Sequence, residues 1–199
     1  MAGTLLTTFF QRCYVLLKIN MFFLLFSVLG GIVLGVGPSL RMAFSLFSLY
    51  RWNVADYQMK AAKKLFYQNF WETNRVTLIH FGICFLLGIN LWLAIQLKGL
   101  LFLAISFLLI LLLLVCLFLF PIYLYLTLFL KEHRSIMLKI SGYILFTEGK
   151  QWLVHSLGLI LLTLLFMKIP AIGFFWGMGS LIVYWSLFLE KKTVFLLAE

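Results

Sequence analysis

Four polar side chains stand in or beside long apolar stretches of this chain, where a polar group often has a function. Asn20 and Asn90 lie inside or at the edge of apolar runs, whereas His80 and His155 each lie near the start of one. Imidazole titrates near neutral pH, and polar side chains at membrane depth can line the path of a solute or an ion. Their simpler role is a hydrogen bond to a neighbouring helix, worth about 1 kcal/mol. We therefore treat these four as candidate polar residues at membrane depth.

The acidic residues do not form a catalytic or ion-coupling pattern. Each falls in an expected interfacial or terminal segment: Asp56, Glu72, Glu132, Glu148, Glu190 and Glu199. The sequence contains no HExxH, GxSxG or phosphate-loop motif, and its three cysteines form no CxxC or Cys/His cluster. We therefore expect no catalytic, cofactor-binding or metal-binding residues. The lack of acids inside the apolar runs also argues against cation- or proton-coupled transport.

The composition is that of a membrane protein. The chain is 64% hydrophobic and 11% charged, whereas soluble domains carry about 25% charged residues. Residues 99–130 contain no charged side chain, and a bilayer core needs roughly 20 apolar residues. The net charge of +10 fits basic residues that gather on the cytoplasmic side beside anionic lipid. We expect membrane lipids as partners and no nucleic acid.

The apolar runs predict an all-α polytopic membrane protein with one domain and six transmembrane helices arranged as three hairpins. These hairpins cover about residues 19–52, 76–128 and 152–189. The run Pro38–Tyr50 is short, and the number of spans falls to five if it does not cross the bilayer. Six spans place most basic residues on one side, with both termini cytoplasmic in the cell membrane. Only Arg41, Lys98 and Lys168 would then lie near the outer face.

Glycine and proline mark the expected hairpin turns, because they supply unusual φ values or end a helix. The turn residues are Gly37, Pro38, Gly99 and Pro170. The second and third hairpins also begin alike, since a cation precedes a histidine by five residues in Arg75–His80 and in Lys150–His155. The two hairpins could therefore be parallel repeats, or the match could be chance.

Two amphipathic stretches, at about residues 56–74 and 131–149, predict helices that lie at the cytoplasmic membrane surface. Each could rest on lipid alone or form a docking surface for a partner. The candidate docking residues are Met59, Lys60, Lys64, Phe66 and Phe70 in the first helix, and Ile136, Lys139 and Ile140 in the second.

Three segments resemble the bacterial YesL family: 20–27 (NMFFLLFS), 35–43 (GVGPSLRMA) and 64–71 (KLFYQNFW). The resemblance is clearest over about residues 15–80, and the later spans agree mainly in layout. The chain departs from the family pattern at Gly30-Gly31 and at Arg41. The family has no established activity, but its genes in Gram-positive bacteria often lie beside carbohydrate importers of the ATP-binding-cassette (ABC) type.

The resemblance implies an accessory, non-catalytic membrane subunit that packs against the permease subunits of a sugar importer. An alternative is a stand-alone transporter or channel for a small solute, with a path lined by the four polar residues. A third alternative is an integral membrane enzyme, which ranks last because no catalytic constellation is present.

Overall fold

The computed structural model of the protein describes residues 2–130, 134–147 and 149–197. In this part of the chain all regular structure is helical, which confirms the expected all-α class. The helices are α1 (Ala2–Leu29), α2 (Val33–Tyr50), the short 3₁₀ helix η1 (Val54–Asp56), α3 (Met59–Tyr67), α4 (Phe70–Ala94), α5 (Leu100–Leu126), α6 (Arg134–Thr147), α7 (Gly149–Lys168) and α8 (Pro170–Leu197).

Five of the described helices are long and apolar enough to cross a membrane: α1, α2, α4, α5 and α8. The architecture fits a multi-pass membrane protein. The short run at 38–50 belongs to an 18-residue helix of sufficient length. The expected span at 152–167, in contrast, is shorter than the five candidate membrane spans, because the described apolar part of α7 is Val154–Lys168.

The first hairpin does not turn at Gly37 and Pro38, so that expectation was wrong. Pro38 lies inside α2, and the chain turns earlier, where Gly31 has φ 80° and Ile32 has φ 60°. Gly37 is needed for close packing, because a Cβ atom there would collide with Oγ1 of Thr77 in α4. The other expected turn residues do lie where the chain turns: Gly99 precedes α5 with φ 129°, and Pro170 is the first residue of α8.

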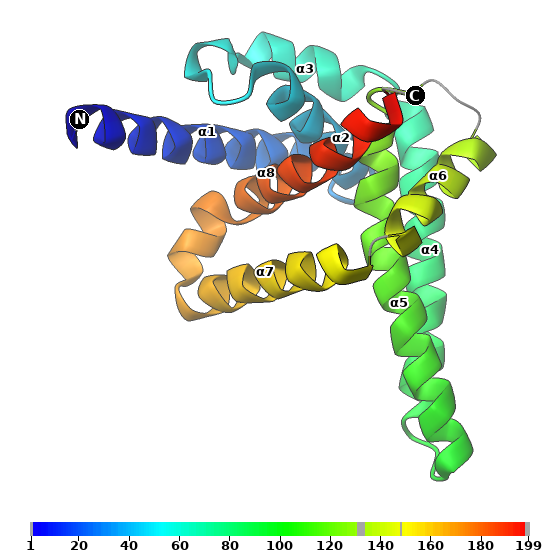
Figure 1. Ribbon diagram of the computed structural model, residues 1–199. Helices are drawn as coiled ribbons and strands as arrows, with labels where there is room; N and C mark the ends of the chain where they lie inside the picture. The colour runs from blue at the N-terminus through cyan, green and yellow to red at the C-terminus, as the bar shows by residue number, and fades with distance from the viewer. Residues whose placement is uncertain (1, 131–133, 148, 198–199) are drawn as a thin grey trace.

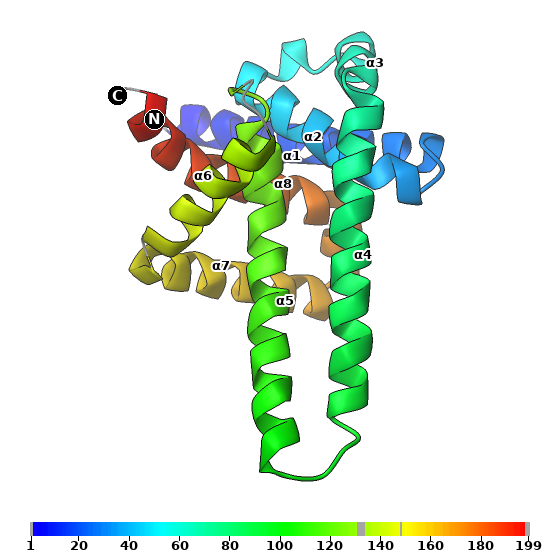
Figure 2. The ribbon, with the colours of Figure 1, turned by 90° about the vertical axis from the view of Figure 1, so that its right-hand side faces the viewer.

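The helices form a crossed arrangement. α4 and α5 form a long hairpin, and α1, α7 and α8 run crosswise to it (Figures 1 and 2). The first hairpin, α1–α2, packs against α8, and α6 packs against α5. An up-and-down bundle of six parallel and antiparallel helices, which the three-hairpin prediction implies, would not show this crossing.

The core lies where the base of the α4–α5 hairpin meets α2. The fully buried side chains include Met42, Phe44 and Phe47 of α2 and Ile122 and Tyr125 of α5. Phe44 and Tyr125 pack edge to face, with ring centroids 5.8 Å apart. The base of the hairpin is therefore anchored by about 2 kcal/mol or more for each large buried side chain.

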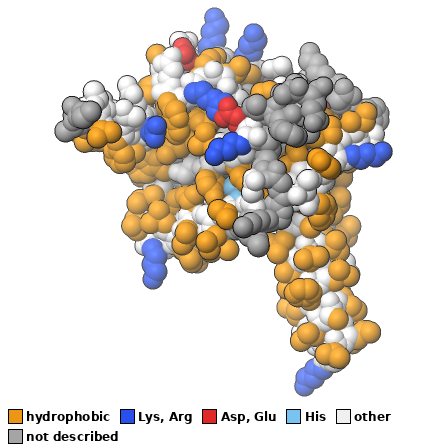
Figure 3. Space-filling model, viewed as in Figure 1, with side chains coloured by type: hydrophobic (Ala, Val, Ile, Leu, Met, Phe, Trp, Pro, Cys, Tyr) orange, Lys and Arg blue, Asp and Glu red, His pale blue; other side chains and the backbone are white. Residues whose placement is uncertain are grey.

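Beyond this base, the α4–α5 hairpin projects away from the rest of the chain. Hydrophobic side chains cover its visible face (Figure 3), and Leu100, Leu103 and Phe107 are each at least 68% exposed. Such an apolar surface is stable only against lipid or another apolar partner. The hairpin is the part of the fold best suited to a membrane.

Candidate functional site

Asn20 joins α1 to α8 and is almost completely buried. Its Nδ2 donates to the carbonyl oxygen of Phe174 (2.8 Å), and its Oδ1 accepts from the amides of Met178 (3.0 Å) and Gly179 (3.2 Å). In a regular helix the Met178 amide would bond to the Phe174 carbonyl. The carboxamide thus inserts into the α8 ladder, which is a known cause of helix bending, and Figure 1 shows α8 bent in its first half.

Asn90 differs from Asn20. Its side chain is exposed on the projecting part of α4 and donates to the carbonyl oxygen of Leu86 in its own helix (2.8 Å). This bond uses one hydrogen of the Asn90 carboxamide and does not connect α4 to another helix. The two asparagines therefore do not contribute to one site.

The two histidines also lie in separate places, although each stacks on a ring of the next long helix. The His80 ring stacks on Phe120 of α5 at 4.3 Å and lies beside Cys84. His155 is 2% exposed and stacks on Tyr184 at 4.6 Å and Phe188 at 4.0 Å, both in α8. His155 therefore packs α7 onto α8, whereas His80 lines a groove between α4 and α5.

The apolar side of α3 is used inside the fold. Phe66 is 1% exposed and packs on Phe26 of α1, with ring centroids 4.9 Å apart, and Phe70 is half-buried against the core. Phe66 is therefore not available to a partner, contrary to the docking prediction. Met59, Lys60 and Lys64 remain exposed.

The apolar side expected for α6 is buried only in part. Met137, Ser141 and Ile144 face the core, whereas Ile136 is 41% exposed. Lys139 is exposed and Ile140 is half-buried. Three of the acidic residues named above, Glu132, Glu148 and Glu199, lie outside the described residues, as do Lys131 and His133.

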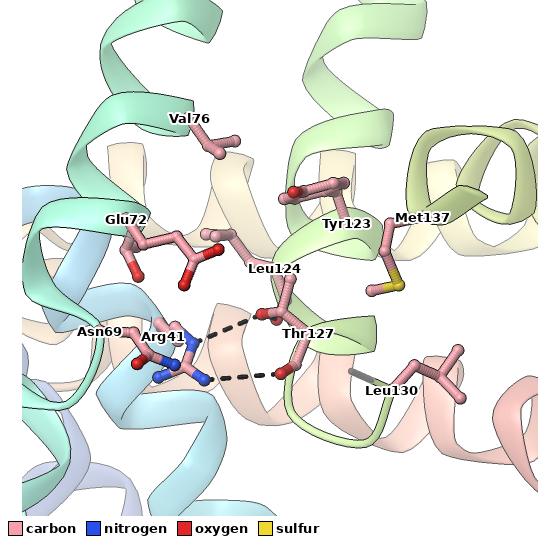
Figure 4. A pocket seen from close by; sticks show the side chains of 10 residues that line it. Arg41, Asn69, Glu72, Val76, Tyr123, Leu124, Thr127, Leu130 and Met137 are labelled. Atoms are coloured by element: carbon pink, nitrogen blue, oxygen red, sulfur yellow. Dashed lines mark hydrogen bonds between the residues drawn. The ribbon is translucent and has the colours of Figure 1, made fainter. Parts of the chain in front are cut away.

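A polar cavity of about 370 Å³ lies at the base of the α4–α5 hairpin (Figure 4). Its polar lining comes from three helices and the loops beside them: Arg41 from α2, Asn69 before α4, Glu72 and Thr73 from α4, and Thr127 after α5. The Leu124, Leu130 and Met137 side chains form an apolar wall. The cavity thus combines opposite charges with an apolar surface.

Arg41 is the central residue of this cavity and is 8% exposed. Its guanidinium donates to Oγ1 of Thr127 (3.4 Å), to the Thr127 carbonyl oxygen (3.5 Å) and to the Gln68 carbonyl oxygen (3.2 Å). The carboxylate of Glu72 acts on it electrostatically, and both side chains point toward the same space in Figure 4. The site can hold a ligand that carries an anionic group, a cationic group or both.

These contacts contradict the expectation that Arg41 lies near the outer face of the membrane together with Lys98. Arg41 bonds to Thr127, which follows α5, whereas Lys98 precedes α5. The 27 residues of α5 separate the two ends by about 40 Å. Arg41 therefore lies at the end of the hairpin that also carries α3 and α6.

Sequence reasoning singled out Arg41 but did not assign it to a site. A signal was present, because Arg41 is the only charged residue within the otherwise apolar stretch 33–50. An ionisable residue in such a stretch is a candidate functional residue by default. Its partners could not be found, because Gln68 and Thr127 lie 27 and 86 residues further along the chain.

Residues 16–91 match the family model described as "Protein of unknown function, DUF624". The match begins midway along α1, covers the rest of the first hairpin and α3, and ends near the end of α4, so it includes Arg41, Asn69, Glu72 and Thr73. No curated protein and no solved structure is significantly similar to the chain. The match covers less than half of the chain and supplies no activity.

Proposed function

We infer that this chain is an accessory, non-catalytic membrane subunit that associates with the permease subunits of an ABC-type carbohydrate importer. The observation that supports this most is that the candidate polar residues do not converge. Asn20 and His155 pack between α1, α7 and α8, Asn90 faces outward, and His80 lies in a separate groove. A stand-alone solute path would need such groups to line one passage.

The projecting hairpin gives a second reason. α4 and α5 pack mainly on each other beyond their base and present apolar side chains outward. Transmembrane helices of this kind associate through van der Waals packing with helices of a partner. We propose that the α4–α5 hairpin packs along a permease subunit within the bilayer.

The stretch with the YesL resemblance, about residues 15–80, lies almost entirely within the stretch that matches the DUF624 model. We propose that the chain is a YesL-type protein of the cell membrane, with both termini in the cytoplasm. The start of α1 and the end of α8 lie away from the tip of the α4–α5 hairpin (Figures 1 and 2). This arrangement supports a common side for the termini.

The decisive experiment is purification of the tagged chain from its native membrane in mild detergent, followed by mass spectrometry of the proteins that come with it. Stoichiometric recovery of two permease subunits is the expected result, together with reduced uptake of a glycan after deletion of the gene. Recovery of the chain alone, with solute flux through the purified protein in vesicles, would replace the proposal with a stand-alone transporter.

A matched pair of variants tests the exposed face of α3. Lys60→Glu/Lys64→Glu reverses two exposed cations on α3, and Lys98→Glu/Lys168→Glu reverses two exposed cations elsewhere. We expect the first pair to lower recovery of the permease subunits and the second pair to leave it unchanged. Equal loss in both pairs would show that α3 has no special role in the association.

A further inference from the structure

The polar cavity around Arg41 borders an apolar groove. The groove, of about 250 Å³, lies between α4 and α5, and Val76 and Tyr123 line both spaces. Apart from His80 and Cys116, its other lining residues are apolar: Ile79, Ile83, Leu119, Phe120 and Leu138. A ligand that occupies both spaces must have a polar end and an apolar chain.

The cavity and the groove lie at the membrane depths of a lipid's headgroup and of its acyl chain, respectively. α5 is about 40 Å long, from its 27 residues, and a bilayer measures about 40–45 Å across both headgroup regions. With the Lys98 turn at one surface, Arg41 and Thr127 lie at headgroup level on the other. The groove, which begins at Val76 and passes His80 and Ile83, lies deeper in the hydrocarbon region.

The charges in the cavity select the headgroup. Arg41 uses one N–H on each guanidinium nitrogen for Thr127 and Gln68, so two of its five N–H groups remain for a ligand. A phosphate suits the guanidinium, because it accepts two parallel hydrogen bonds. Glu72 lines the same cavity and would repel a purely anionic headgroup, but it attracts an ammonium group.

We propose that the base of the α4–α5 hairpin binds one zwitterionic phospholipid of the ethanolamine class. The phosphate lies at Arg41, the ammonium group lies near Glu72, and one acyl chain follows the groove along Ile79, Ile83 and Leu119. This inference does not depend on the proposed function, since the site is built from this chain alone.

Native mass spectrometry of the full chain tests the proposal, after reconstitution in equal amounts of phosphatidylethanolamine and phosphatidylglycerol and extraction in mild detergent. We expect one phosphatidylethanolamine per chain. Arg41→Gln should lower its retention about tenfold or more, because a charge-assisted hydrogen bond is lost. Leu119→Trp fills the groove without touching Arg41 and should lower retention similarly, whereas Lys98→Gln, which removes a cation at the far end, should retain the lipid.

The headgroup is tested by Glu72→Gln, which should shift preference from phosphatidylethanolamine to phosphatidylglycerol. An unchanged preference, or equal loss of lipid in Lys98→Gln and Arg41→Gln, would overturn the proposal. Retention that depends on Arg41 but not on Leu119, with equally tight binding of soluble glycerophosphoethanolamine, would mean a small-solute site instead. Should Arg41→Gln fail to fold, Arg41→Lys and Leu119→Trp still decide the outcome, with thermal melting as the check on folding.

Discussion

Arg51 at the end of α2 and Glu190 in α8 form an ion pair with two hydrogen bonds, although they lie 139 residues apart in the chain. The Arg51 residue has φ 51°, and its carbonyl oxygen accepts a hydrogen bond from the Tyr57 hydroxyl (2.6 Å). The pair therefore fixes the connection after α2 and holds it to α8.

Removal of this ion pair should lower stability modestly. Both side chains are more than a third exposed. Arg51→Gln or Glu190→Gln should therefore lower the free energy of unfolding by about 1 kcal/mol or less. The measurement is the thermal melting temperature of the purified chain in detergent. The charge-swapped double variant Arg51→Glu/Glu190→Arg should recover part of the loss, and Lys191→Gln, at the exposed neighbour of Glu190, should have no effect.

Asn20→Leu should be more damaging, because it leaves the Phe174 carbonyl and the Met178 amide without their buried partner. An unsatisfied buried polar group costs about 1–3 kcal/mol, and part of this is recovered if α8 straightens and closes its own ladder. Asn90→Leu is the matched control, since Asn90 is exposed and bonds only within α4. Equal melting temperatures for the two variants would show that Asn20 does not hold α1 to α8.

Gly37→Ala should separate α2 from α4. The added methyl group would collide with Thr77, and overpacking of this kind costs about 1–3 kcal/mol. Thr77→Ala in the same chain removes the nearest atom and should restore part of the stability. Gly88→Ala in α4 is the control, because no atom lies near its added Cβ; we expect it to be neutral or stabilising by up to about 1 kcal/mol. Equal loss in both glycine variants would contradict the packing role of Gly37.

Single cysteines can establish which ends of the hairpin face which side of the membrane. In a chain whose three native cysteines are replaced by alanine, Lys98→Cys and Lys60→Cys should react with a membrane-impermeant thiol reagent from opposite sides. Lys98 precedes α5 at the tip of the hairpin, whereas Lys60 lies in α3 beside its base. Labelling of both from the same side would mean that the hairpin does not cross the bilayer.

The helical class and most helix positions could be predicted from the sequence, because long apolar runs have few alternatives in a membrane. The turn at Gly31-Ile32 could not be predicted, because the Gly37-Pro38 dipeptide is the stronger local turn signal. The structure shows that Gly37 is there for another reason, which is the close approach of Thr77. The use of helix faces was also predicted only in part. Phe66 lies on the expected apolar side of α3, but it packs inside the fold instead of facing a partner. In α6, Met137 is buried and Ile136 is exposed, because packing against distant helices decides the buried side and periodicity alone does not reveal it.

The polar cavity around Arg41 could not be predicted from the sequence either. Arg41, Glu72 and Thr127 belong to three separate segments, and their proximity depends on the crossing of α2 with the base of the hairpin. Each residue is visible in the sequence as a polar group near an apolar run. The register that brings them together is a tertiary property, so the cavity was found only in the structure.

Pro121 marks a boundary within α5 that should be visible in natural variation. Residues 100–120 before it are mostly exposed, whereas residues from Pro121 to Leu126 are buried in the core. Over residues 100–115, before the groove residues Cys116, Leu119 and Phe120, one apolar side chain can replace another at little cost, because fluid lipid adapts to any shape. After Pro121, each side chain fits fixed neighbours. Related sequences should therefore drift freely along residues 100–115 and change slowly along residues 121–126.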